Sequence, residues 1–355
     1  MSFQLIGNVF RRQTPSYITI FITSKCNCRC PFCFYWKAIE ETNKNNELTK
    51  EELRVLSKNI KKPLVLSLTG GEPYLRVDIF EIVENFLKNS SPMYLSIPTN
   101  GSFPDKVKKM IEHVFCIKPD VNFRVNLSLD AIGEEHDNIR QYKGLFSKVE
   151  ETYNIISPLR TKYRLFIDVN TVLSAYTKDT IKETVNYIYN KFDFDNINFT
   201  LVRGDPKDPE AKKVSCKDYQ EVSDLVNSLK KNRETRQYSR LSRASSYLKT
   251  KYIEQTILEN KMIVPCVAGR KLITIKENGD VYPCELLLKK MGSLREFNYN
   301  IKRLLKSHKA KNVLKHIKET KCFCTFECAA MANVIFNVSN YSKLFKAFFR
   351  PIDYK

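Results

Sequence analysis

The sequence predicts an α/β protein, an open, partial (β/α)6 TIM-like barrel followed by a small cysteine-rich α+β domain. Short apolar runs alternate with helical stretches through roughly the first two hundred residues, and this alternation favours a parallel sheet. Polar and glycine-rich motifs follow several of these runs, at the strand ends where parallel barrels carry their chemistry. Beyond residue 262 a predicted hairpin lies between cysteines, which indicates a second, smaller unit.

Six strands are expected in the barrel, over residues 16–23, 63–69, 93–98, 122–130, 165–172 and 196–202. A helix is expected to begin after Thr49, because Glu52 three positions later completes a capping box. The expected division is an N-terminal extension (1–15), the barrel (16–204), a basic helical connector (205–262), the cysteine-rich domain (263–330) and an amphipathic basic and aromatic tail (331–355).

Composition limits the classes of protein. No run of eighteen or more apolar residues occurs, so no membrane-spanning helix is expected, and the first residues do not form a secretory signal. Eleven cysteines, most in metal-like spacings, favour a reducing cytoplasm over a disulfide framework. The net charge of +20 suits an anionic substrate, but a lysine- and asparagine-rich coding bias with solvated faces explains it equally well.

Three cysteines follow the first strand in a C-x3-C-x2-C spacing, Cys26, Cys30 and Cys33. Three thiolates on one short loop suit three corners of a [4Fe–4S] cube, which leaves the fourth iron open for a small molecule. Phe32 places an aromatic residue just before the last of them. Cys28 lies outside this spacing and is interpreted as a bystander. The alternative is a zinc knuckle that also uses Cys28.

Other strand ends carry polar motifs. A Gly-Gly-Glu turn follows the second strand, where glycines permit close backbone approach and a carboxylate can hold an ammonium group. The third strand ends at an asparagine, the fourth ends at a serine and an aspartate, and an arginine follows in a His-Asp-x-x-Arg stretch. The candidate residues are Gly70, Gly71, Glu72, Asn100, Ser128, Asp130 and Arg140.

The cysteine loop and these motifs together resemble the radical S-adenosylmethionine (radical SAM) enzymes. The resemblance implies that the open iron binds the amino and carboxylate groups of S-adenosylmethionine, and that reduction yields a 5′-deoxyadenosyl radical that removes hydrogen from an unactivated C–H. It implies the following roles: Gly70, Gly71 and Glu72 hold the methionine amino group, Ser128 and Asp130 the ribose, and Arg140 the carboxylate, with Phe32 and Asn100 also at the cofactor.

Simpler explanations for these residues remain open. Arg140 would also form an ordinary surface salt bridge with Asp137 or Glu135. Ser128 and Asp130 are common strand-end capping residues.

A second group of cysteines lies around the predicted hairpin at Asn278-Gly279. Its members are Cys266, Cys284, Cys322, Cys324 and Cys328, and they resemble the SPASM/twitch auxiliary-cluster domain of radical SAM enzymes. Five cysteines are one too many for a single four-cysteine site, so one auxiliary [4Fe–4S] cluster with four of these five as ligands is expected. Structural zinc is the alternative. Cys116 and Cys216 lie outside both groups.

The substrate is expected to be a small molecule, anionic or linked to a sugar or lipid, because only about fifteen residues precede the first strand and leave no room for a peptide-binding domain. A peptide-modifying maturase is the alternative. An RNA-modifying enzyme, suggested by the basic stretch 230–251, and a non-catalytic iron–sulfur protein are less favoured. The resemblance implies an electron donor such as flavodoxin or ferredoxin.

The C-terminal tail carries an apolar stripe at helical spacing, formed by Tyr341, Leu344, Phe345, Phe348 and Phe349. The stripe predicts a helix that docks on the barrel or on the cysteine-rich domain. The alternative is a short interfacial helix that brings the enzyme to an anionic membrane.

Overall fold

The computed structural model describes residues 7–8, 15–41, 46–231 and 240–349. Its centre is one nine-stranded sheet with the strand order β6-β5-β4-β3-β2-β1-β7-β8-β9. The first six strands pair in parallel, which confirms the predicted barrel. They are β1 (Tyr17–Thr23), β2 (Val65–Gly70), β3 (Tyr94–Thr99), β4 (Asn122–Ser128), β5 (Leu165–Leu173) and β6 (Asn196–Leu201).

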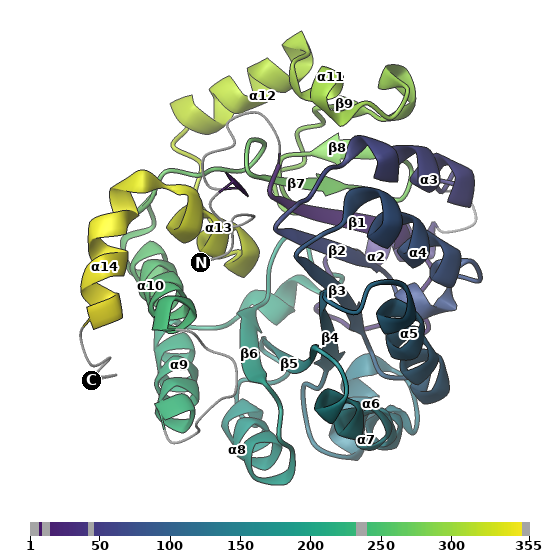
Figure 1. Cartoon of the computed structure of the whole chain (residues 1–355). Helices are drawn as coiled ribbons and strands as arrows, with labels where there is room; N and C mark the ends of the chain where they lie inside the picture. The colour runs from purple at the N-terminus through teal and green to yellow at the C-terminus, as the bar shows by residue number, and fades with distance from the viewer. Residues whose placement is uncertain (1–6, 9–14, 42–45, 232–239, 350–355) are drawn as a thin grey trace.

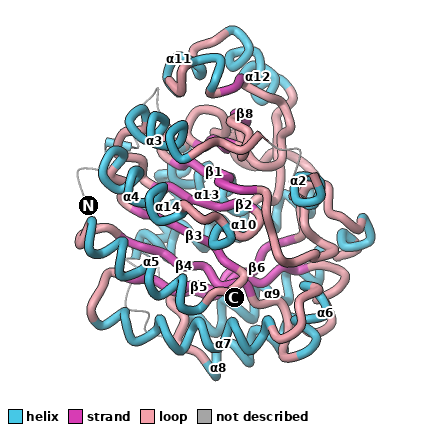
Figure 2. Tube along the Cα trace, turned by 90° about the vertical axis from the view of Figure 1, so that its right-hand side faces the viewer, coloured by secondary structure: helices cyan, strands magenta, loops and turns pink. Residues whose placement is uncertain are grey.

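Helices between the strands cover the outer face of the sheet (Figures 1 and 2). They are α2 (Trp36–Glu40), α3 (Lys50–Asn59), α4 (Ile79–Ser90), α5 (Pro104–Ile117), α6 (Glu134–Arg140), α7 (Leu145–Ile156) and α8 (Ile181–Lys191). The capping box predicted for α3 is confirmed. The backbone N–H of Glu52 donates to Thr49 Oγ1 at 3.2 Å, and that of Thr49 donates to the Glu52 carboxylate at 2.8 Å.

The two faces of the sheet differ in chemistry because successive side chains point to opposite sides of a strand. Leu66, Leu95 and Ile167 are fully buried under the helices and form the main core. Their neighbours Ser67 and Ser96 are half-buried on the opposite face. The barrel is therefore apolar towards its helices and polar towards its interior, where a polar ligand can be accommodated.

The cysteine-rich region continues the barrel sheet. Its hairpin, β7 (Leu272–Ile275) and β8 (Asp280–Tyr282), is antiparallel as predicted, and Gly279 has the positive φ of 87° that the turn requires. However, β7 pairs in parallel with β1, Tyr17 opposite Leu272. The sequence did not predict this pairing, which places the hairpin directly beside the strand that leads into the cysteine loop. The region also contains β9 (Gly292–Ser293), α11 (Ile301–Leu305), α12 (His308–Glu319) and α13 (Glu327–Phe336).

The connector is helical, as expected, and forms α9 (Cys216–Lys231) and α10 (Arg240–Glu259). Most of the basic stretch that suggested RNA binding has no described side chains, since these are described only up to residue 229 and again from 244. The described ranges also contain five 3-10 turns, at Pro73–Leu75, Ser157–Thr161, Pro209–Lys212, Arg295–Phe297 and Val338–Asn340. Among the described residues, no helix is long and apolar enough to cross a membrane.

The tail forms α14 (Tyr341–Phe349), which packs against the connector helix α10. Leu344 is buried in a cluster with Ala244, Leu248 and Val334, so the stripe docks on α10 and α13 and not on the barrel. Phe345 is 65% exposed, and the side chain of Phe349 lies outside the described residues. The docked arrangement therefore buries one part of the apolar stripe, at Leu344, and leaves Phe345 exposed.

Docking of α14 can be tested with two matched leucine substitutions. Leu344→Ala should lower the free energy of unfolding by about 2–4 kcal/mol, because it leaves a cavity between α14 and α10. Leu258→Ala, at a position that is 62% exposed on α10, should change it by less than about 0.5 kcal/mol. Thermal or urea unfolding followed by circular dichroism measures both. Equal, small shifts would mean that α14 does not dock, as expected of a membrane-binding helix.

Candidate cofactor and cluster sites

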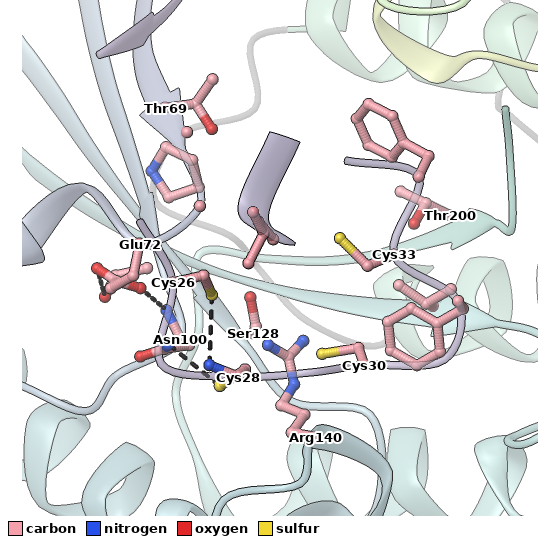
Figure 3. A pocket seen from close by; sticks show the side chains of 18 of the residues that line it. Cys26, Cys28, Cys30, Cys33, Thr69, Glu72, Asn100, Ser128, Arg140 and Thr200 are labelled. Atoms are coloured by element: carbon pink, nitrogen blue, oxygen red, sulfur yellow. Dashed lines mark hydrogen bonds between the residues drawn. The ribbon is translucent and has the colours of Figure 1, made fainter. Parts of the chain in front are cut away.

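The three cysteines of the loop border one cavity at the carboxyl ends of the barrel strands (Figure 3). Residues from the ends of all six barrel strands meet there, although they lie far apart in sequence. Of the residues predicted from the sequence, those that line the cavity are Cys26, Cys30, Cys33, Phe32, Gly70, Gly71, Glu72, Asn100, Ser128 and Arg140. Asp130 is the one predicted member that does not line it.

Backbone hydrogen bonds fix the cysteine loop from several sides. The N–H of Arg29 donates to the carbonyl of Arg140 at 3.0 Å, and the N–H of Asp208 donates to Pro31 at 2.8 Å. Within the loop, the N–H of Cys33 donates to the carbonyl of Cys30 at 3.1 Å. The thiols are therefore held by a preformed frame rather than by a free loop.

Burial raises the pKa of the Cys30 thiol to about 12 and that of Cys33 to about 11, although the nearby Arg140 guanidinium lowers both. The hydrogen bond with Cys28 lowers the pKa of Cys26 to about 6 and raises that of Cys28. Bound iron would take the place of the thiol protons. Arg140 then supplies positive charge beside the thiolates.

The glycines hold the second strand against the loop. A Cβ atom on Gly70 would lie 2.2 Å from the carbonyl oxygen of Thr23, and one on Gly71 would lie 2.2 Å from that of Lys25. The N–H of Glu72 donates to the same Lys25 carbonyl at 2.7 Å. Any larger residue would separate β2 from the cysteine loop, so both glycines position the site through the backbone.

Glu72 is a buried carboxylate at this contact, with 1% of its surface exposed. It accepts hydrogen bonds from Thr99 Oγ1 at 2.9 Å and from the backbone N–H groups of Asn100 at 2.7 Å and Tyr74 at 3.1 Å. Burial raises its pKa to about 7, and these donors oppose the rise. An ammonium group in the cavity would favour the ionised form.

Arg140 and Asp130 form a buried ion pair, with Nη2 of Arg140 2.7 Å from the Asp130 carboxylate. The other oxygen of Asp130 accepts from the backbone N–H of Val172 at 2.9 Å. The alternative of a surface salt bridge from Arg140 to Asp137 or Glu135 is wrong, since Asp137 instead accepts from the N–H of Phe146 at 2.8 Å. Asp130 orients Arg140 from behind the cavity.

Two further predicted residues, Asn100 and Ser128, also lie at the cavity. The Nδ2 of Asn100 donates to Asn27 at 2.7 Å and lies 3.3 Å from the Cys28 sulfur, so Cys28 also lies at the cavity wall. Ser128 lines the cavity half-buried, between Cys26 and Arg140 in Figure 3.

The far wall of the cavity was not predicted from the sequence. Thr200, Leu201 and Arg203, at the end of β6, line it together with Phe34. The only signal was their place at the carboxyl end of a barrel strand. Arg203 pairs with Glu285 at 2.9 Å and with Glu327 at 3.2 Å, which ties this wall to the cysteine-rich region.

The five cysteines of the C-terminal region do not share one environment. Burial raises the pKa of Cys266 to about 11 and of Cys324 to about 12, and the backbone N–H groups of Ala268 and Phe326 oppose this. The Cys284 sulfur accepts from the N–H of Leu287 at 3.3 Å. Cys328, in contrast, lies in the first turn of α13 and accepts from the Tyr17 hydroxyl at 3.3 Å.

All eleven cysteines are free thiols. Within the described parts of the chain, no three His, Cys, Asp or Glu side chains converge on the position of a single ion. The ligands of a cubane cluster bind different iron atoms and need not converge on one point. The donors of the loop therefore fit a cluster, and the buried Glu72 and Arg140 fit the ammonium and carboxylate of a methionine moiety.

Residues 20–188 match the sequence model of the Radical SAM superfamily, and this segment contains the loop cysteines, Glu72 and Arg140. This segment is a radical SAM domain. Members of this superfamily are enzymes that use S-adenosylmethionine and a [4Fe–4S] cluster. The match therefore supports an enzyme over a non-catalytic iron–sulfur carrier.

Two relatives of this radical SAM chain align with it over different lengths. It is 32% identical over 180 residues to a GTP 3′,8-cyclase of Clostridium perfringens. This alignment covers 49% of this chain and 51% of the cyclase. It is 24% identical over 324 residues to a cysteine-type anaerobic sulfatase-maturating enzyme of Clostridium novyi. This alignment covers 82% of this chain and 79% of that enzyme. The chain thus spans about half the length of the cyclases it matches.

Solved structures share the fold of this radical SAM chain. Native anSMEcpe with bound AdoMet superposes with a TM-score of 0.60 over 94% of this chain and 97% of the other, at 21% identity. The likeness therefore includes the cysteine-rich region as well as the barrel.

The raised pKa of Glu72 predicts a pH-dependent affinity for S-adenosylmethionine. As the pH falls from 8 to 6 through the pKa of about 7, the carboxyl becomes neutral and loses its attraction for the cofactor ammonium. Affinity should fall by up to about tenfold. Equilibrium binding to the anaerobically reconstituted protein measures this. Glu72→Gln should bind weakly at both pH values, and an unchanged pH profile in that variant would contradict the assignment.

Proposed function

We propose that this chain binds S-adenosylmethionine on a [4Fe–4S] cluster and removes hydrogen from an unactivated C–H of a substrate in the same cavity. The observation that carries this proposal is the meeting of three loop thiols, a buried glutamate and a buried arginine around one cavity. When bound and reduced, the cluster and cofactor supply a 5′-deoxyadenosyl radical.

The chain positions these groups. Cys26, Cys30 and Cys33 would hold three irons, and Glu72 would accept from the methionine ammonium. Asp130 occupies Nε and Nη2 of Arg140, at 2.8 and 2.7 Å, so Nη1 would meet the carboxylate. The buried carboxylate of Asp130 thus acts through Arg140 and not by direct contact with ribose. The walls of the cavity would shield a reactive radical from side reactions with other hydrogen donors.

We infer that Cys266, Cys284, Cys322 and Cys324 hold one auxiliary [4Fe–4S] cluster, and that Cys328 is the spare cysteine. Cys266, Cys284 and Cys324 each receive backbone N–H groups from the following turn, as expected of thiolate ligands. The electrostatic neighbours of Cys324 include the other three. Cys328 is instead a neighbour of Tyr17, Arg203 and Glu285.

The substrate we propose is a small molecule, anionic or linked to a sugar or lipid. The polar interior of the barrel and the net charge of +20 support this choice. A peptide substrate is the second candidate, because the relative that aligns over 82% of the chain is a sulfatase-maturating enzyme. Untargeted metabolite and peptide profiling with and without the enzyme distinguishes the two by which pool loses two hydrogens or gains a linkage.

The radical assignment is tested by removing the loop thiols together. The reconstituted protein, reduced with dithionite, should form 5′-deoxyadenosine, which chromatography quantifies. The variant Cys26→Ala, Cys30→Ala, Cys33→Ala should form none, because the cluster has lost its ligands. A Cys116→Ala, Cys216→Ala variant is the matched control and should retain activity. Undiminished cleavage in the triple variant would refute the proposed function.

The auxiliary assignment is tested by iron content in the triple variant. It should retain about four irons, because the second set of thiols is separate. Adding Cys324→Ala should remove that iron, whereas adding Cys328→Ala should leave it in place. Stoichiometric zinc without iron would identify a structural zinc site. Equal loss of iron in both variants would contradict the division of the five cysteines.

A further inference from the structure

The segment before the auxiliary cysteines is a strongly basic surface. Residues 302–321 contain eight lysine and arginine side chains and a single acidic residue, Glu319. All eight cations are exposed. On α12, Lys311, Lys315 and Lys318 follow helical spacing and share one face. Of the eight, only Lys315 makes an ion pair within the described structure, 3.7 Å from Glu319.

Only part of this charge serves the stability of the helix, namely Lys318 in the last turn of α12, where the helix dipole favours a cation. The first turn of α12 has no acidic residue, and Lys309 and Lys311 lie near the amino end, where the helix dipole disfavours positive charge. A helix stabilised by its own charges would pair lysines with glutamates at i, i+4, and α12 has one such pair. The concentration of unpaired charge therefore indicates an external partner.

The basic surface ends at the auxiliary cysteines. Lys321 is followed directly by Cys322, which is half-buried, and then by Phe323, which is 41% exposed. An exposed aromatic ring beside a predicted cluster ligand, directly after a basic segment, combines a small apolar contact with a large positive charge. Weak, transient redox complexes have this character: a small interface assembled by charge.

We propose that α12 and the segment 321–323 form the docking surface for a small acidic one-electron carrier protein, which reduces the auxiliary cluster. The proposal rests on the proposed function for the presence of that cluster. One electron leaves the reduced flavin or iron–sulfur centre of the carrier and enters the cluster, and no bond forms or breaks. The positive surface complements an acidic partner and raises the rate of encounter.

The docking surface lies at one end of the molecule, opposite α7 and α8 in both views (Figures 1 and 2). This separation provides a matched control. Lys311→Gln, Lys318→Gln and Lys321→Gln remove three charges from the docking surface. Lys109→Gln, Lys143→Gln and Lys148→Gln remove three from α5 and the region around α7.

The probe is a flavodoxin, in its oxidised form for binding and as the hydroquinone for reduction. Stopped-flow measurement of cluster bleaching in the Cys26, Cys30, Cys33→Ala background follows the auxiliary cluster alone. At low ionic strength, the docking-surface variant should be reduced about tenfold more slowly than the parent, and the control variant at the parent rate. Added salt should slow the parent and abolish the difference.

Equal rates in the two lysine variants would overturn the proposal. So would a flavodoxin affinity that does not change with salt. A third outcome would assign the surface to nucleic acid instead. In that case the parent would bind tRNA with a steep salt dependence and the docking-surface variant would not, while the flavodoxin kinetics of the two would be the same. Binding of oxidised flavodoxin requires no cofactor cleavage, so failure of the radical chemistry and failure of this docking are distinguishable.

Discussion

The close backbone contact between the end of β2 and the cysteine loop is the constraint on which the site depends. Cβ atoms at Gly70 and Gly71 would lie 2.2 Å from the carbonyl oxygens of Thr23, the last residue of β1, and of Lys25, just before Cys26. This contact places the buried carboxylate of Glu72 beside the cluster loop and aligns it with the backbone of Asn100. The ammonium-binding group and the cluster-binding loop therefore cannot shift independently.

A second buried arrangement supports the opposite side of the cavity. The side chain of Arg140 is held by Asp130, and its carbonyl accepts from Arg29 in the cysteine loop. His136 accepts from the N–H of Asp130 at 3.1 Å, and burial lowers the pKa of this imidazole to about 2, so it remains a neutral acceptor. A buried pair that loses one partner costs several kcal/mol, so Asp130 has a strong structural role besides orienting Arg140.

Local signals in the sequence were sufficient for the barrel and for most of the cavity. Each strand is an apolar run with a clear end, and in a parallel sheet those ends share one edge, so Cys26, Glu72, Ser128 and Arg140 meet. Asp130 differs because its side chain is oriented by a hydrogen bond from the backbone of β5. The alternation of residues along β4 does not predict that contact. The β1–β7 pairing joins residues 17 and 272, and no local pattern encodes such a long-range contact.

That pairing has a consequence for how the two cysteine regions relate. Because β7 adjoins β1, the hairpin brings Glu285, next to Cys284, to the cavity wall formed by Arg203. The Arg203 guanidinium also lies over the ring of Phe34, next to Cys33, and over that of Phe326, at 5.0 and 4.6 Å. One arginine thus contacts residues adjacent to ligands of both predicted clusters. A paired, stacked guanidinium adds little net stability, but its fixed geometry sets orientation. We infer that Arg203 keeps the auxiliary region in register with the cavity.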